Sequence, residues 1–185
     1  MATTIQQIES APGAYPALPY SDPDTIPADI TAIGDTVWQR IEAYTAYRYT
    51  ARNVAWVVEG PGEWHPPLAP ATISTVEIWS HRAADWETAT LDASPLGGYW
   101  LPCSGPYRFT ASVGSGTVPA SINEAFRRLT DYLLADPGTA GATFDYRSLA
   151  GGALMERIER DAAWMARALQ NSGAADLLRP YRKVP

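Results

Sequence analysis

The residues best suited to chemistry are carboxylates placed among tryptophans in the middle of the chain. The carboxylates are Glu63, Glu77, Asp85 and Glu87, and the tryptophans are Trp56, Trp64, Trp79, Trp86 and Trp100. Paired carboxylates beside aromatic rings are what a glycosidase or a sugar-binding module requires. The alternative is a compact tryptophan core with the carboxylates in solvent, because a small sheet needs large side chains to bury enough area. Both interpretations stay open, and the candidate interface aromatics are Trp64, Trp79, Trp86 and Trp100.

Other arrangements that support catalysis or metal binding are not found in the sequence. His65 and His81 lie far apart, and neither has a second ligand at helical spacing. The single cysteine, Cys103, excludes an internal disulfide, and we expect it to be a small buried hydrophobe. No nucleophile elbow and no glycine-rich phosphate loop is present. We therefore expect no catalytic residue, no metal site and no cofactor, and we do not expect an enzyme.

The composition is that of a globular protein with an uneven charge. Net charge is −6, which argues against a general nucleic-acid-binding surface, and no apolar run approaches the length of a membrane span. The first residues lack the basic and apolar regions of a signal peptide. Residues 1–30 contain four carboxylates and no base, whereas the last seven residues contain three bases and no acid. We expect two surfaces with different partners.

The chain is expected to begin with a proline-rich extended arm over residues 1–26. Proline recurs at positions 12, 16, 19, 23 and 27, and this density excludes a helix. A first helix is predicted over 27–47, where apolar residues recur at steps of three and four: Ile30, Ile33, Val37, Ile41 and Tyr44. Residues 48–113 are rich in β-branched and aromatic residues and in turn signals, which predicts a small antiparallel β-unit.

Two more helices and a tail are predicted after the β-unit. The helix over 119–135 starts at Pro119, and the segment from Ser121 to Glu124 has capping-box spacing. A third helix over 152–171 would carry a narrow seam of Met155, Ile158, Met165 and Leu169, suited to packing on one other helix or subunit. The expected fold class is α+β and mainly helical. It has a three-helix core in one domain over 27–173, an inserted β-unit, and extended arms at both ends.

The tail over 174–185 is predicted to be an extended docking peptide. Its candidate docking residues are Leu177, Leu178, Arg179, Pro180, Tyr181, Arg182 and Lys183. Large apolar side chains with basic flanks suit a groove with an acidic rim. Alternatively, Leu177 and Tyr181 fold back onto the subunit's own third helix.

Three segments, in order along the chain, resemble the head–tail connector (adaptor) proteins of long-tailed phages and gene transfer agents. They are Ile41–Arg48 at the end of the first helix, Val118–Ala125 at the start of the second, and Leu177–Arg182 in the tail. The chain differs from that family in its proline-rich arm, where a short helix is common. It also has only Asp131–Leu134 in place of an aromatic-rich stretch.

The resemblance implies a structural virion protein of the neck, assembled in the host cytoplasm, that forms a ring of about twelve copies. The ring would join the portal to the stopper or tail terminator and line the channel through which genomic DNA passes without sequence recognition. The tail would dock onto the portal, while the arm and the third helix would contact neighbouring copies. No membrane is involved. The alternatives are another neck or tail component, such as a stopper or terminator, and a carbohydrate-binding module that uses the tryptophan-rich β-unit.

Overall fold

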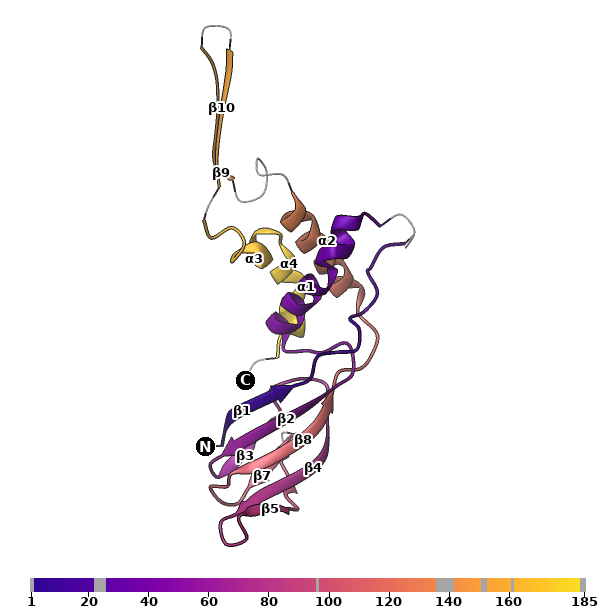
Figure 1. Ribbon diagram of the computed structural model, residues 1–185, viewed down its shortest axis with the longest axis vertical. Coiled ribbons are helices and arrows are strands. Elements are labelled where there is room, and N and C mark those ends of the chain that lie inside the picture. Colours follow the sequence, from indigo (N-terminus) through magenta and orange to yellow (C-terminus); the bar gives the residue numbers. More distant parts are fainter. Residues whose placement is uncertain are drawn as a thin grey trace. The chain divides into compact units, whose positions relative to one another are not determined.

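The chain forms two compact units (Figure 1). The computed structural model describes residues 2–21, 26–95, 97–135, 142–150, 153–160 and 162–183. The sheet unit is built from Met1–Pro16, Ala46–Thr117 and Lys183–Pro185, and the helical unit from Ala17–Thr45 and Val118–Arg182. Each unit is therefore discontinuous in sequence. In the described part of the chain, no helix is long and apolar enough to cross a bilayer.

The sheet unit contains a five-stranded and a three-stranded antiparallel sheet. The larger sheet has the order β1-β2-β8-β4-β5, with β1 Thr3–Glu9, β2 Arg52–Glu59, β8 Tyr107–Val113, β4 Ala71–Ser80 and β5 Asp85–Thr88. The smaller sheet has the order β3-β7-β6, with β3 Gly62–Trp64, β7 Tyr99–Leu101 and β6 Asp92–Ala93. Strands β1 and β5 are therefore the two edges of the larger sheet (Figure 1).

The core of the sheet unit follows from alternation in its two central strands. In β2 and β8 every second residue is buried, including Trp56, Phe109 and Tyr107. This period of two places one face of each strand in the core and the other toward solvent. Trp64 of β3 stacks on Phe109 at 4.1 Å between ring centroids, and thus joins the small sheet to the large one. Aromatic residues supply much of the buried area, as expected for so small a sheet.

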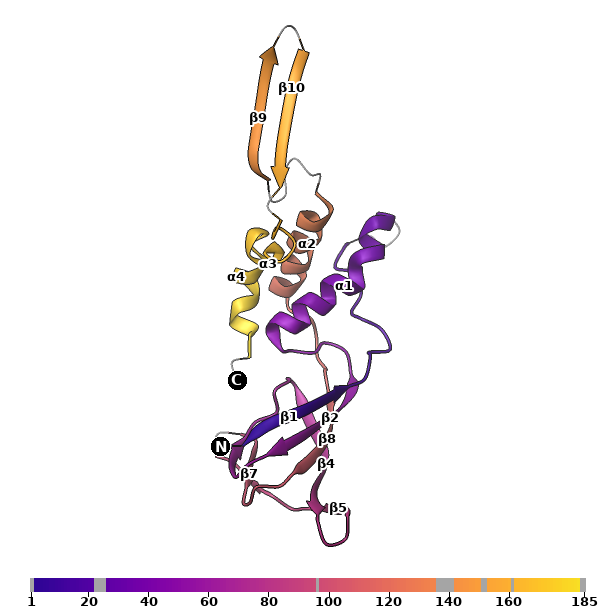
Figure 2. The ribbon, with the colours of Figure 1, turned by 60° about the vertical axis from the view of Figure 1, so that its left-hand side comes forward.

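The helical unit is built on α1 and α2. Its elements are α1 Ala28–Thr45, α2 Ala120–Leu134, α3 Ala168–Asn171, α4 Ala174–Leu178 and the 3₁₀ turn η2 Arg179–Tyr181. Between α2 and α3 the chain forms a two-stranded hairpin, with β9 Ala142–Ala150 and β10 Ala153–Arg160 (Figure 2). Trp38 of α1 and Phe126 of α2 are fully buried, with ring centroids 4.9 Å apart. Gly34 lets Leu18 approach α1, because a Cβ there would lie 2.7 Å from Leu18 Cδ2.

The expectation of a mainly helical fold is wrong. The described residues form a sheet-rich α+β fold with ten strands and only two long helices. A large part of the predicted third helix, 152–171, is the strand β10, and only Ala168–Asn171 forms α3. Apolar residues in this stretch recur at steps of three and four, which is the spacing of a helix. Pairing of β10 with β9 nevertheless gives the backbone N–H and C=O groups their hydrogen bonds without a helix.

Both ends of the chain also differ from the expected extended arms. Within the arm over 1–26, Thr3–Glu9 pairs with β2 as a sheet strand. The tail forms α4 and η2, because Gly173, at φ 72°, ends one helical segment and lets the next begin. The expected capping box is not formed: the N-cap of α2 is Pro119. Cys103 is exposed and lies beside Tyr107, with Sγ 2.9 Å from the hydroxyl oxygen, so it is not a core residue.

Candidate functional site

Strand β1 faces the core of the sheet unit with polar side chains. The indole Nε1 of Trp64 donates to Thr4 Oγ1 at 2.9 Å, and that of Trp56 donates to Gln7 Oε1 at 2.8 Å. Both tryptophans are buried, so an indole N–H left without an acceptor would cost free energy. The polar residues of β1 therefore complete the core chemically. Alternation alone does not predict such a strand, because its hydrophobic residues do not point inward.

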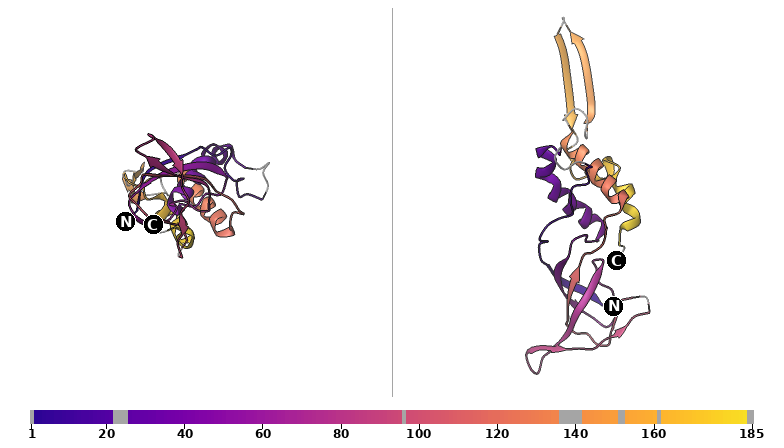
Figure 3. Two further views of the ribbon diagram at one scale, coloured as in Figure 1. Left: turned by 90° about the horizontal axis from the view of Figure 1, so that it is seen from below. Right: turned by 90° about the vertical axis from the view of Figure 1, so that its right-hand side faces the viewer.

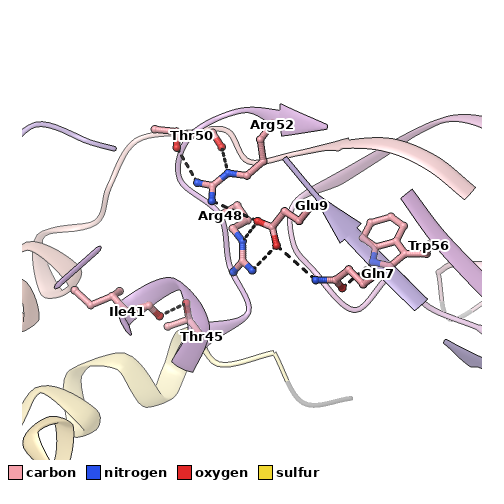
Figure 4. A network of polar contacts seen from close by, with 8 residues as sticks. All are labelled: Gln7, Glu9, Ile41, Thr45, Arg48, Thr50, Arg52 and Trp56. Atoms are coloured by element: carbon pink, nitrogen blue, oxygen red, sulfur yellow. Dashed lines mark hydrogen bonds and ion pairs between the residues drawn. The ribbon is translucent and has the colours of Figure 1, made fainter. Parts of the chain in front are cut away.

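Glu9 at the end of β1 binds two arginines (Figure 4). Its carboxylate accepts from Arg48 at 2.5 and 2.9 Å and from Arg52 at 3.3 Å. Burial raises the pKa of Glu9, but the hydrogen bonds and charges of the two arginines lower it by a larger amount. The pKa of Glu9 is therefore below its ordinary value of 4.5. Arg52 is also held by the Thr50 hydroxyl and carbonyl. This charge cluster fastens the end of β1 to the segment that precedes β2.

The opposite side of β1 carries two exposed isoleucines. Ile5 is 56% and Ile8 60% exposed, the largest exposed aliphatic side chains of the described residues. Cross-strand register pairs Ile8 with Ala55 and Gln6 with Val57, so this face continues onto the outer face of β2. A sheet edge with apolar residues outside and polar residues inside reverses the usual pattern. This face is a candidate interaction surface.

A second candidate surface lies at the other edge of the same sheet. Trp79 of β4 and Trp86 of β5 are cross-strand partners, with ring centroids 5.4 Å apart in an edge-to-face arrangement. The Arg108 guanidinium lies 4.6 Å from the Trp86 ring centroid and binds Glu77 Oε2 at 2.7 Å. The hydrogen bond from Arg108 lowers the pKa of Glu77. An arginine therefore occupies one face of Trp86, which leaves less of a flat platform for a sugar ring.

Two of the four carboxylates of the predicted site, Glu77 and Glu87, are not brought together as a catalytic pair. Register pairs Glu77 with Thr88 and Ile78 with Glu87, so Glu77 and Glu87 lie on opposite faces of the sheet. Asp85 is exposed and accepts the backbone N–H of Trp86 at 2.7 Å. Two carboxylates that share a substrate must face the same cleft. This arrangement does not allow that.

Glu63 has neighbours that the sequence did not indicate. Its Oε1 accepts from the buried Ser94 hydroxyl and lies 3.3 Å from His65 Nε2. A catalytic serine needs the histidine next to its hydroxyl. Here both groups contact the same carboxylate oxygen, so the cluster bridges β3 and the segment after β6 without forming a nucleophile. No group of three or more potential metal ligands occurs among the residues that the structure describes.

The predicted interface tryptophans have different environments. Trp64 is 4% exposed and belongs to the core, whereas Trp100 on β7 is 54% exposed. Trp79 and Trp86 are partly exposed. The core interpretation therefore applies to Trp64, and the surface interpretation applies to Trp100.

The predicted docking tail packs largely on its own unit. Leu178 is fully buried, and α4 packs beside α2 (Figure 3). Ser121 and Tyr181 share a hydrogen bond of 2.9 Å, and the Arg182 guanidinium lies 5.4 Å from the Tyr44 ring centroid. Within the sheet unit, the Lys183 ammonium donates to the Pro66 carbonyl, and burial lowers its pKa. Among the predicted docking residues, Arg179, Pro180 and Arg182 are exposed, and Leu177, Tyr181 and Lys183 are partly exposed.

The predicted seam does not lie on one helix. Met155 and Ile158 are on β10, whereas Met165 and Leu169 line an open groove of about 300 Å³ beside α1. Arg40, Ala43, Tyr44 and Ala166 complete the groove, and Arg40 Nη1 donates to the Met165 carbonyl at 3.2 Å.

Two solved structures have a fold similar to that of the chain. One is a chain of the neck of a native gene transfer agent (GTA) particle computed with C12 symmetry, with 17% sequence identity and a TM-score of 0.55. That likeness covers 98% of this chain and 97% of the other. Another is a chain of the virion of a native GTA particle, with 14% identity, a TM-score of 0.51, and coverage of 100% and 96%. No protein-family model and no curated protein matches the sequence. The likeness is one of fold, and it extends over nearly the whole of each chain.

Proposed function

We propose that this chain is a structural protein of a virion neck, where it forms a ring adaptor between the portal and the stopper or tail. The observation that carries the proposal is its fold likeness, over nearly the full length of both chains, to a chain of a C12-symmetric GTA neck. The sequence resemblance to head–tail connector proteins points the same way, and it rests on different evidence. A ring of about twelve copies is the expected assembly.

The proposed ring contacts itself, the portal and the stopper, and genomic DNA passes through its channel. A net charge of −6 suits a channel that lets DNA pass better than one that binds it tightly. Assembly in the host cytoplasm is part of the proposal. This role requires no catalysis. We therefore expect Glu77→Gln and Glu87→Gln to leave assembly intact, and turnover of a glycan that these changes abolish would contradict the proposal.

Portal docking by the tail is retained in a modified form. Leu178 anchors the tail within its own unit, so the predicted docking residues that are exposed to a partner are Arg179, Pro180 and Arg182. Arg179 has a salt bridge of 3.5 Å to Asp176, but both side chains are largely exposed. An exposed pair of this kind contributes little, so Arg179 can exchange its partner at small cost. The proposed contact is therefore a basic surface rather than an extended peptide.

Particle reconstitution tests the proposed function directly. The full chain, mixed with the portal protein of its own particle, should form a ring that native mass spectrometry and electron microscopy can count. Arg179→Glu with Arg182→Glu should weaken capture by the portal, while a matched reversal at the exposed Arg128 on α2, whose ion pair with Glu124 is likewise exposed, should not. A monomeric chain that never binds a portal would refute the adaptor role. Location below the ring in the particle would instead indicate a stopper or terminator.

A carbohydrate-binding module remains the second candidate, favoured by the exposed ring of Trp100. Glycan-array binding by the isolated protein, lost in Trp100→Ala, would support it.

A further inference from the structure

The five-stranded sheet has an apolar cluster at each of its two edges, and the described part of the chain leaves both at least partly exposed. The first, here the β1–β2 edge, carries Ile5, Ile8 and the exposed Glu59 at the end of β2. The second, the β4–β5 edge, carries Trp79, Trp86 and the exposed Arg82 in the turn between the strands. These edges are the two ends of the strand order (Figure 1). Large apolar side chains that gather on an exposed surface usually mark a site of interaction with another molecule.

We propose that copies of this chain associate head-to-tail through these sheets, with the β1–β2 edge of one copy against the β4–β5 edge of the next. This proposal rests on the adaptor ring proposed above, and it names the contact between neighbouring subunits of that ring. Two different, complementary surfaces on one subunit are what a cyclic heterologous assembly requires. The occupant of each edge is therefore a second copy of this chain.

Register gives the relative heights of the two edges along the strands. One cross-strand row runs through Thr4, Val58, Tyr107, Ile78 and Glu87. Strands β2 and β4 are both antiparallel to β8, so Glu59 and Trp79 each lie one residue beyond this row, toward the same end of the sheet. The turn that holds Arg82 follows directly after β4. Arg82 lies three residues beyond Trp79 toward that end, so neighbouring sheets must be offset by that length along the strands to bring the two charges level.

The exposed charges at these positions are complementary. Among the described residues, neither Glu59 nor Arg82 has an ion-pair partner within its own chain. The outer face of β1 and β2 carries Glu59 and no base. At the other edge, Asp85 and Glu87 pair with Ser80 and Ile78 and so lie on the face of the sheet opposite Trp79 and Trp86, and Glu77 is neutralised by Arg108. Arg82 is thus the exposed charge there that suits Glu59, with apolar contact between the isoleucines and the tryptophans providing most of the affinity.

Strand β1 also lacks most of the features that prevent edge association. It contains no proline and no lysine, and its outer face carries Ile5 and Ile8 beside the uncharged Thr3 and Gln6. The irregularity between Thr4 and Gln6 interrupts its ladder, so Gln6–Glu9 is the regular part of the edge. The polar contacts of Thr4, Gln7 and Glu9 hold β1 in place, which leaves its outer face free to bind without rearrangement.

Sedimentation velocity on the full chain tests the contact. Ile5→Ser with Ile8→Ser should raise the Kd of self-association at least about tenfold. Met165→Ser, which removes a similarly exposed side chain from the helical unit, is the matched control and should leave it unchanged. Circular dichroism and thermal melts check that each variant is folded.

Charge reversal separates this contact from any other. Glu59→Arg alone and Arg82→Glu alone should each weaken association, because each places like charges in the interface. An equimolar mixture of the two variants should restore it, since alternating copies then present opposite charges at every contact. Asp35→Arg on α1 is the control for a change of net charge.

The outcomes distinguish the two proposals. A wild-type chain that stays monomeric at every concentration and with the portal refutes the ring, and with it this contact. A wild-type ring that the isoleucine and charge variants leave unchanged, or a mixture that does not recover, refutes this contact alone.

Discussion

Leu178 offers the sharpest test of how the C-terminal tail is used. Its side chain is fully buried between α4 and the long helices of the helical unit. Truncation to alanine removes the transfer free energy of the lost methyl and methylene groups and leaves a cavity that the helices can fill only in part. Leu→Ala changes at such sites cost about 2–5 kcal/mol. A short helix near the chain end relaxes more readily than a central one, so we expect a loss near 3 kcal/mol for Leu178→Ala.

The neighbouring leucine is the matched control. Leu177 is only partly buried, so Leu177→Ala should cost less than about 1 kcal/mol. Urea unfolding monitored by circular dichroism, with the transitions of the two units fitted separately, measures both changes. Equal losses for the two variants, or no loss for Leu178→Ala, would refute the packed tail. That result would restore the extended docking peptide expected from the sequence, whose truncation after Gly173 would leave the melting temperature nearly unchanged.

Three further predictions concern the sheet unit and the hairpin. The pKa of Glu9 is lowered on folding, so its contribution to stability is present above about pH 4.5 and is lost as the pH falls through the folded pKa. Glu9→Gln should therefore flatten the fall of the melting temperature between neutral pH and about pH 3. Trp64→Ala should cost about 3–5 kcal/mol, whereas Trp100→Ala should change the free energy of unfolding by less than about 0.5 kcal/mol, both measured in urea. Replacing residues 142–160 with a short Gly-Ser linker should leave both units folded by thermal melt, because β9 and β10 form a sheet of their own; loss of a unit's transition would contradict this.

The two long helices could be predicted because their apolar residues recur at helical spacing. The helix expected over 27–47 corresponds to α1, and the one over 119–135 corresponds to α2. Both have one buried stripe, which includes Val37 and Ile41 in α1 and Phe126 in α2. The stripe is a physical requirement of packing one helix against another, and it is therefore visible in the sequence.

The hairpin lies where the periodicity predicts a helix, although the sequence contains a signal for the turn. Gly151-Gly152 separates two runs of similar length, which is a known hairpin pattern. The apolar residues of 153–160 fit a helix and a strand almost equally well, because a short run samples both periods. Strand β1 could not be found by alternation, because it turns Thr4 and Gln7 inward to the indoles. The tail was misjudged because a proline at 180 excludes a long helix but permits a 3₁₀ turn.

The candidate tryptophans and the candidate carboxylates differ in how far the sequence specifies their surroundings. Trp64 is in the core and Trp100 on the surface, as the two open interpretations allowed. The carboxylates gave no hint that Glu63 would meet Ser94, which lies far along the chain on another loop. Such contacts depend on strand pairing across a long sequence separation, and the sequence alone does not specify that pairing.

The dependence of two buried indoles on β1 has a consequence for the order of folding. Strand β1 precedes its partner β2 by the whole of α1, and the tryptophans that it serves come later still along the chain. During synthesis β1 therefore stays unpaired until the ribosome has translated α1 and β2. Such a long-range pairing is slow to form, and a waiting strand with exposed isoleucines is open to pairing with other chains. We therefore expect nascent or truncated copies to need chaperone protection during this interval. A protein of the same size whose first strand pairs with the next segment of chain should need less.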